Sequence, residues 1–249
     1  MPGLTPGGVK RPARPRPAAA QGESSRTAGA IKSASDGPRI IHIMKQAKNS
    51  TIPVMLPDTR GVVLSRFGKG NTKLGPDIVT YSKPAIRSCP GRTSWCEANC
   101  YAVRINGLVA EVHRMNFDAG SEVPDLPEGT QFVRFHVAGD FDSVAYIERW
   151  TEIARQNPNV LFWGYTRSWR IPALLECLET LRSLPNVQLF ASCDMESDPA
   201  PTGWRAAWLD ADSRQSGLVC PEERGKVQNC QACGYCFRKQ RGDVIFIKH

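Results

Sequence analysis

The feature that most constrains the fold is a regular alternation of apolar and amphipathic segments between residues 132 and 192. Short apolar runs predict strands, and longer runs with apolar residues at helical spacing predict the helices between them. The strands are expected at 132–137, 160–165 and 187–191, and the helices at 144–156 and 172–184. Ser143 is the expected N-cap of the first helix, and Pro158 follows its end.

Three strands that alternate with two helices at this spacing predict parallel β-α-β units. The fold class is therefore expected to be α/β, as a partial (β/α) barrel or a mostly parallel sheet. Weaker apolar patterns on both sides of residues 132–192 predict further elements of the same fold. They predict strands at 40–43, 62–64, 78–81, 206–209 and 244–247, a hairpin turn at 68–71, and a helix from 96 to about 116 with Val103, Leu108, Val109, Val112 and Met115 on its apolar face.

The charge of the chain is concentrated at its beginning. The net charge is +8, and residues 1–50 contribute +7 of it through nine Lys and Arg against Glu23 and Asp36. Residues 1–38 lack apolar periodicity and cannot bury enough apolar surface to offset the entropy of ordering, so we expect a disordered basic tail. It is interpreted as a solvated tail or as an arm that contacts nucleic acid or a partner protein.

The remaining residues, 39–249, are long enough for a single α/β domain with one core. The sequence has no run of about 18 apolar residues, so no transmembrane helix and no contact with a membrane are expected. The first residues also lack the apolar stretch of a secretory signal. A cytoplasmic location follows as the expectation.

Seven of the nine cysteines fall in two short segments, 89–100 and 220–236. The first cysteine group consists of Cys89, Cys96 and Cys100, and the second of Cys220, Cys230, Cys233 and Cys236. In a reducing compartment, such groups bind metal or take part in redox chemistry more often than they form disulfides. We therefore expect all seven to be metal ligands.

The second group offers four thiolates, which is enough for a closed zinc site or for a [4Fe–4S] cluster. Its last three cysteines have the spacing C-x2-C-x2-C. This spacing favours an iron–sulfur cluster, because zinc sites more often use two separate C-x2-C pairs. Zinc is the alternative at this site.

The first group provides only three ligands locally. A fourth could come from Cys193, His113 or His136, or from a molecule that is not protein. With that position open, a [4Fe–4S] cluster could bind a substrate or cofactor, whereas a distant fourth residue would make the site structural. Cys177 lies on the leucine-rich face of the helix at 172–184, so we expect it to be a buried free thiol.

Polar residues follow the three central strands. In parallel α/β folds such residues gather at one edge of the sheet, where ligands bind. The residues expected there as cofactor contacts are Gly139, Asp140, Arg167, Ser168 and Asp194. Arg167 could bind a carboxylate or phosphate, or form a surface salt bridge.

Two further polar side chains occupy the strand at 132–137. Arg134 and His136 are two residues apart, so we expect them on one face of the strand. There they could line a cavity, or they could be buried and hydrogen-bonded. Tryptophans near the strand ends, Trp163 and Trp169 among them, could stack on a base, so a nucleotide or nucleic acid is one candidate substrate.

Together these motifs resemble the gene product 88 proteins of phages and mobile elements. The resemblance covers about residues 60–249 and rests on motifs that occur in order. They are 71–74, Cys89-Pro90, Cys96, Cys100-Tyr101-Ala102, Phe135-His136-x-x-Gly139-Asp140-Phe141, 165–168 and the C-terminal cysteines.

More distantly, the C-x6-C-x3-C-Tyr-Ala segment is similar to that of phage proteins related to radical S-adenosylmethionine (SAM) enzymes. This resemblance implies that the first group holds a [4Fe–4S] cluster whose open iron binds the amino and carboxylate groups of SAM. It further implies that Gly139-Asp140 contacts the methionine amine. The usual spacing in those enzymes is C-x3-C-x2-C, and this chain departs from it.

Two functions follow as expectations. The first is an iron–sulfur enzyme of radical-SAM-like type, which would need an electron donor and an unidentified substrate. The second is a non-catalytic module, stabilised by zinc or iron–sulfur, that binds nucleic acid or protein for a phage or mobile element. The near-neutral charge of residues 51–249 favours the first.

Overall fold

The computed structural model describes residues 67–239 and 242–247. The predicted tail at 1–38 and the predicted strands at 40–43 and 62–64 lie outside them. The described strands are β1 (Gly68–Lys69), β2 (Ile78–Tyr81), β3 (Phe132–Phe135), β4 (Leu161–Thr166), β5 (Val187–Ser192), β6 (Arg205–Leu209), β7 (Leu218–Val219) and β8 (Val244–Phe246). The α-helices are α1 (Ser94–Ala98), α2 (Gly107–Asp118), α3 (Val144–Gln156), α4 (Pro172–Ser183) and α5 (Cys230–Cys233).

In the described part of the chain these strands form one eight-stranded sheet in the order β1-β2-β3-β4-β5-β6-β8-β7. The β1–β2 pair is antiparallel, and every other neighbouring pair is parallel. The predicted α/β class with a mostly parallel sheet is therefore confirmed. Among the described helices, none combines the length and apolar character needed to cross a membrane.

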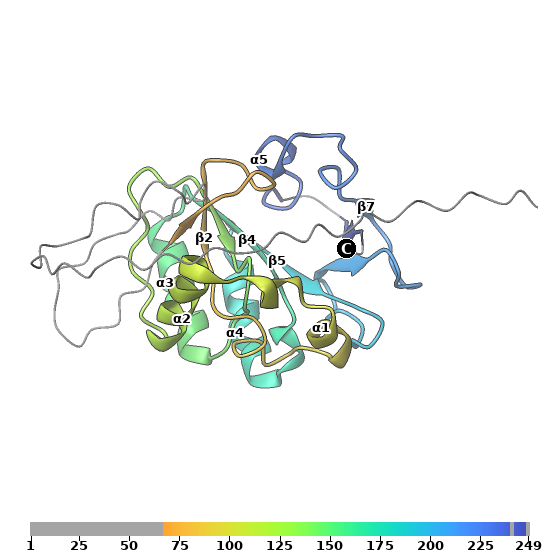
Figure 1. Cartoon of the computed structure of the whole chain (residues 1–249), viewed down its shortest axis with the longest axis horizontal. Helices are drawn as coiled ribbons and strands as arrows, with labels where there is room; N and C mark the ends of the chain where they lie inside the picture. The colour runs from red at the N-terminus through yellow and green to blue at the C-terminus, as the bar shows by residue number, and fades with distance from the viewer. Residues whose placement is uncertain (1–66, 240–241, 248–249) are drawn as a thin grey trace, which may run out of the picture. The chain divides into compact units, whose positions relative to one another are not determined.

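The order of the strands determines where the helices lie. From β2 to β6, each successive strand is added on the same side of the one before it. Because parallel crossovers are right-handed, this order places the connecting helices on one face of the sheet. Figure 1 shows α3 and α4 on one side of β4 and β5, and we name this side the helix face.

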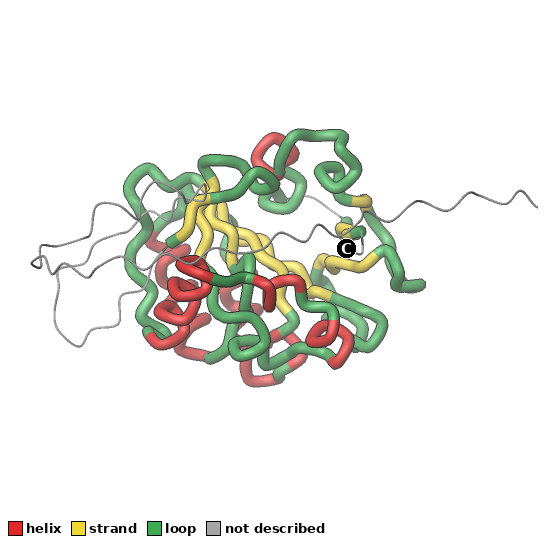
Figure 2. Tube along the Cα trace, in the orientation of Figure 1, coloured by secondary structure: helices red, strands yellow, loops and turns green. Residues whose placement is uncertain are grey.

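The last two strands reverse this direction. β8 follows β7 in sequence but lies between β6 and β7 in the sheet. A right-handed connection from β7 back to β8 must cross the opposite face, and the segment between these strands does so. It carries α5, which Figures 1 and 2 show on the other side of the strands from α3 and α4. We name this side the cysteine face.

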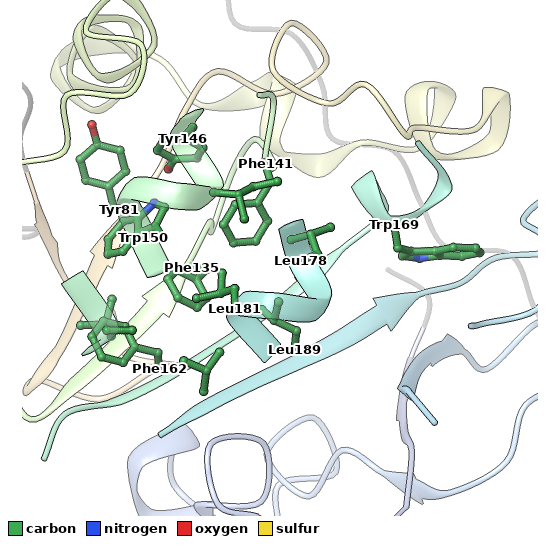
Figure 3. Close-up of a cluster of buried hydrophobic side chains, with 14 of the residues drawn as sticks. Tyr81, Phe135, Phe141, Tyr146, Trp150, Phe162, Trp169, Leu178, Leu181 and Leu189 are labelled. Carbon is green, nitrogen blue, oxygen red and sulfur yellow. The ribbon is translucent and has the colours of Figure 1, made fainter. Parts of the chain in front are cut away.

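Each face has its own core. On the helix face, Phe135, Trp150 and Phe162 are fully buried, and the Phe135 and Trp150 rings meet edge to face with centroids 5.0 Å apart (Figure 3). On the cysteine face, Trp163 of β4 packs on Phe237, with ring centroids also 5.0 Å apart. The sheet is therefore buried on both sides, which explains the nearly continuous apolar run in β4.

Three local predictions were wrong. The expected helix from 96 to about 116 is divided into α1, a 3-10 turn at Tyr101–Arg104, and α2. The break precedes Gly107, which has low helix propensity. Because α2 begins anew there, its buried residues are Val112, His113 and Asn116, while Val103 and Leu108 are exposed.

The other two wrong predictions concern the end of a strand and the position of a turn. The expected strand at 132–137 ends at Phe135, and His136 has a φ of 50° that turns the chain out of the sheet. Its imidazole consequently lies on the helix face, bonded to Tyr146, and does not share a face with Arg134. In the predicted hairpin, Gly68–Lys69 forms strand β1 itself rather than the turn.

Ser143 caps α3 as predicted, because its hydroxyl oxygen accepts a hydrogen bond from the Tyr146 amide at 3.3 Å. Ser143→Ala is expected to lower the free energy of unfolding by about 1 kcal/mol, since the amide loses its acceptor. Urea unfolding followed by circular dichroism measures the change. Ser183→Ala, at the exposed end of α4, is the control and should change it by less than about 0.5 kcal/mol. Equal effects of the two changes would contradict the capping role.

Candidate functional site

The first cysteine group lies at the carboxyl ends of the parallel strands, which we name the rim. Its segment follows β2 and is fixed to the loop after β5. The Thr93 hydroxyl donates to Asp194 Oδ2 at 2.7 Å, and the Trp95 amide donates to Glu196 Oε2 at 2.9 Å. Thr93 also caps α1, the helix that carries Cys96.

The same segment packs tightly on the turn after β4. A Cβ added to Gly91 would lie 1.9 Å from the Arg167 carbonyl oxygen, so only glycine allows this approach. Arg170 donates from Nη1 to the Gly91 carbonyl at 2.9 Å. The three-cysteine segment is thus attached to the ends of both β4 and β5.

Asp194 is central to this attachment. Its side chain is fully buried and forms an ion pair with Arg167 at 3.0 Å. Its second oxygen accepts the Glu196 amide at 3.0 Å. Through these bonds the Asp194 carboxylate joins Arg167, the loop after β5 and the first cysteine segment.

Asp140 makes a similar set of bonds after β3. Its two oxygens accept the amides of Phe141 and Arg167, each at 2.8 Å. Burial raises the pKa of Asp140, although hydrogen bonds from Thr166 and these amides oppose the rise. The carboxylate links the end of β3 to the end of β4.

The other two predicted rim residues are also engaged in packing. Ser168 is fully buried and donates to the Phe141 carbonyl at 2.6 Å. Gly139 has a φ of 81°, and a Cβ there would lie 2.7 Å from the Lys83 carbonyl oxygen. All five predicted contacts thus lie at the rim, where Arg167 joins Asp140 to Asp194 and Asp194 bonds to Thr93 of the cysteine segment. Their contact with a cofactor stays a prediction.

The thiols of the first group share an electrostatic environment. Burial, and after it the charge of Asp140, raise the pKa of Cys89 to about 12, and Cys96 and Cys100 add to the rise. Burial also raises the pKa of Cys96, but the Arg167 guanidinium opposes it. Metal binding would need to displace these protons, and Arg167 is the cation placed to favour the Cys96 thiolate.

The predicted candidates for a fourth ligand lie in the core. Cys193 is 1% exposed, packs on the helix face, and has a pKa raised to about 11 by burial. His136 Nε2 lies 2.9 Å from the Tyr146 hydroxyl.

Cys177 is half-buried on α4, so the expectation of a fully buried thiol was wrong there.

His113 is buried on α2, and desolvation lowers its pKa to about 4. The unfolded state, with an ordinary pKa near 6.5, then binds more protons between pH 4 and 6.5, so stability falls as the pH drops through this window. We expect the free energy of unfolding to be about 1.5 kcal/mol lower at pH 5 than at pH 6.5 from this residue alone.

Urea unfolding at the two pH values tests this expectation. His113→Met should reduce the pH dependence, and the remainder should come from His136, whose pKa is also lowered by burial. An unchanged pH dependence in His113→Met would contradict the assignment.

The second cysteine group covers the cysteine face. Cys230 and Cys236 pack with Trp163, and Cys220 packs with Phe190 and Val244. The segment is joined to the chain before β2 by the Cys230 amide, which donates to the Lys73 carbonyl at 2.8 Å. Cys233 ends α5, three residues from Cys230.

Hydrogen-bond donors and cations surround these sulfur atoms. Burial raises the pKa of Cys236 to about 11, while a hydrogen bond from Tyr165 and the charges of Arg134 and Arg205 oppose the rise. The amides of Glu223 and Glu222 similarly oppose the rise that burial causes at Cys220. These neighbours oppose the effect of burial but do not reverse it, so the pKa values of both thiols stay above their usual value.

Within residues 67–239 and 242–247, no three Cys, His, Asp or Glu side chains are grouped closely enough to surround one metal ion. Four thiolates around one zinc ion would lie about 4 Å from each other. A [4Fe–4S] cluster attaches each thiolate to a different iron and requires less crowding. Metal binding by either cysteine group, as zinc or as a cluster, therefore stays a prediction.

Two kinds of residue that contact the cysteine groups escaped the sequence analysis. Thr93 could have been found, because a threonine before a short helix is a common N-cap. Arg205 and Tyr165 could not have been assigned to the second group, because β6 and β4 approach it only through the crossing of the last connection. No local pattern in the sequence predicts that contact.

Comparison with known proteins gives one family. Residues 123–239 match the family described as "Gene product 88". The Gene 88 protein of Mycobacterium phage L5 is 26% identical over 199 residues, covering 64% of this chain and 81% of the phage protein. The Gene 88 protein of Mycobacterium phage D29 is 23% identical over 200 residues, with the same coverage of each. No solved structure matches the chain.

The family match includes the central strands and the second cysteine group, and it begins after the first. The names of these relatives state no activity. The more distant resemblance to radical-SAM-related proteins stays a prediction.

Proposed function

We propose that this chain, which belongs to the gene product 88 family, is an iron–sulfur enzyme of radical-SAM-like type. In this proposal Cys89, Cys96 and Cys100 hold a [4Fe–4S] cluster with one open iron. The second cysteine group holds another cluster that serves a redox or structural role. SAM and an unidentified substrate, a nucleotide or nucleic acid among the candidates, bind at the rim.

One observation carries the proposal. The segment that bears three cysteines is fixed by Thr93, Gly91 and Trp95 to the ends of β4 and β5, although it follows β2 in sequence. In parallel α/β folds the carboxyl ends of the strands are where ligands bind. A purely structural metal site would not require this position.

The residues of the rim would have distinct tasks. Arg167, whose charge acts on Cys96, would stabilise the thiolate and is the proposed partner of the SAM carboxylate. Asp194 holds Arg167 in place by their ion pair. A cluster held by Cys89, Cys96 and Cys100 would supply one-electron reducing chemistry to SAM bound at the rim.

Anaerobic purification and reconstitution of the full chain test the proposal. We expect about eight iron and eight sulfide per chain and, after reduction with dithionite, the electron paramagnetic resonance signals of cubane clusters. With SAM added, the reduced protein should form 5′-deoxyadenosine.

Two other results would separate the parts of the proposal. Stoichiometric zinc without a cubane signal would contradict it and favour the non-catalytic binding module. Clusters that form without any 5′-deoxyadenosine would remove the radical step and leave an iron–sulfur protein.

A further inference from the structure

An open pocket of about 350 Å³ lies at the rim, beside the segment that carries the first cysteine group. Three parts of the chain surround it, namely the segment after β2, the end of α2 and the start of α3. Its volume is in the range of pockets that hold small organic molecules. The lining residues that matter here are Arg87, Arg92, Phe117, Gly120, Asp142 and Ser143.

A buried lysine holds two sides of this pocket together. Lys83, whose side chain is fully buried, donates from Nζ to both Asp142 oxygens at 2.9 Å and to the Gly120 carbonyl at 3.0 Å. Its ammonium also lies 3.6 Å from the centroid of the Tyr146 ring. Lys83 thus fixes the end of α2 to the start of α3, and it offsets the charge of the acidic residue in the lining.

The first arginine of the pocket is positioned without an acidic partner. The Arg87 guanidinium carbon lies 4.4 Å from the centroid of the Phe117 ring. Within residues 67–239 and 242–247, its guanidinium forms no hydrogen bond or ion pair. A guanidinium stacked on a ring keeps its N–H groups available at its edge, where they can donate in pairs to a phosphate or carboxylate.

The second arginine is only weakly engaged. Arg92 Nε donates to Glu97 at 2.8 Å, but the two side chains are 36% and 52% exposed, and such exposed pairs add little stability. Its Nη1 donates to the Cys89 carbonyl at 3.2 Å. The lining also includes Ser143, the N-cap of α3, where the helix dipole favours an anion. Because Lys83 offsets Asp142, the charge around the pocket is positive.

We propose that this pocket binds a nucleoside monophosphate, with the phosphate on Arg87 and Arg92 and a hydroxyl or amino group of the ligand donating to Asp142. The pocket is larger than a phosphate ion requires, and the partly exposed Asp142 offers an acceptor for a ligand with hydrogen-bond donors. The Phe117 ring adds apolar surface against which a base can pack. The inference rests on the proposed function for the role of this nucleotide as substrate, whereas the binding itself requires no metal.

Isothermal titration calorimetry of the full chain without added metal tests the proposal, with adenosine 5′-monophosphate (AMP) as the probe in a buffer of low ionic strength. Adenosine and inorganic phosphate should each bind at least about tenfold more weakly than AMP, since each lacks part of the contacts. Arg87→Met should weaken AMP binding by about tenfold or more, because the phosphate loses charge-assisted hydrogen bonds.

Three further variants test the role of each cation. Arg92→Met should also weaken AMP binding, and Arg87→Lys should weaken it less than Arg87→Met, because lysine keeps the charge but lacks the forked donors. Arg104→Met is the matched control, since Arg104 is an exposed arginine of the 3-10 turn that does not line the pocket. It should leave the affinity unchanged. The basic residues 1–50 are present in every variant, so their contribution to binding cancels.

Several results would overturn the proposal. They are an absence of AMP binding, equal affinity for adenosine and AMP, and equal affinity of Arg87→Met and the wild type. If Arg87→Met does not fold, unchanged affinity in Arg92→Met would overturn it as well. A single-stranded DNA dodecamer that binds more tightly than AMP, and loses affinity in Arg87→Met, would assign the pocket to nucleic acid instead.

These outcomes are separate from those of the proposed function. AMP binding by a chain that forms no cluster would support the pocket and contradict the iron–sulfur enzyme. A chain that forms clusters and 5′-deoxyadenosine but does not bind AMP would do the reverse.

Discussion

Exchange of Cys96 for serine is expected to remove the iron of the first cysteine group and to leave that of the second. Cys96 lies on α1, which Thr93 fixes at the rim, and the three-cysteine segment offers no spare thiol to replace it. Iron and sulfide per chain should fall by about four each after anaerobic reconstitution. Formation of 5′-deoxyadenosine should fall to background.

Two control variants test whether the loss of iron in Cys96→Ser is specific to the first cysteine group. Cys177→Ser, on α4, changes a half-buried cysteine outside both groups and should keep the full iron content. Cys230→Ser should remove the other half of the iron. If Cys96→Ser and Cys177→Ser retain the same amount of iron, Cys96 is not a ligand.

Removal of the Asp194 carboxylate is expected to have the largest effect on stability. Asp194→Ala leaves the half-buried Arg167 without its partner and the Thr93 hydroxyl without its acceptor. Breaking a buried ion pair by removing one member costs about 3 kcal/mol or more. Urea unfolding of the metal-free protein measures the loss, and thiol modification of Cys96 should become faster as its segment loosens.

The neighbouring loop offers a matched control. Asp198 pairs with Arg170 at 3.6 Å and is 73% exposed, so Asp198→Ala should change the free energy of unfolding by less than about 0.5 kcal/mol. A double-mutant cycle with Arg167→Ala should show strong coupling to Asp194. Equal losses in Asp194→Ala and Asp198→Ala would show that the buried network does not hold the rim.

The parts of the fold that the sequence predicts are those encoded by local periodicity. Strand β4 has the continuous apolar run typical of a strand buried on both faces, α4 has apolar residues at helical spacing, and both lie within one residue of their predicted ends. The position of the rim then follows from the rule that parallel strands share their carboxyl ends. Asp140, Arg167 and Asp194 could therefore be grouped from the sequence alone.

The bonds inside the rim could not be predicted. Thr93 and Asp194 are 101 residues apart, and their contact depends on the path of the segment after β2. His136 is another case, because its side chain should follow the alternation of β3 and instead turns away at a positive φ. That turn depends on packing against Tyr146 and Phe141, which belong to the following helix and loop.

The reversed order of β7 and β8 in the sheet also affects which segments of the sequence can vary by mutation. In the described residues the chain leaves the sheet after Leu218–Val219 and next pairs with it at the neighbouring strand, Val244–Phe246. A different segment between these two strands could therefore replace the present one without altering the order of β2 to β6 or the loops that hold the first cysteine group. The covering of one face and the chemistry of the rim are thus encoded in separate stretches of sequence, and mutation can vary either while the other is kept.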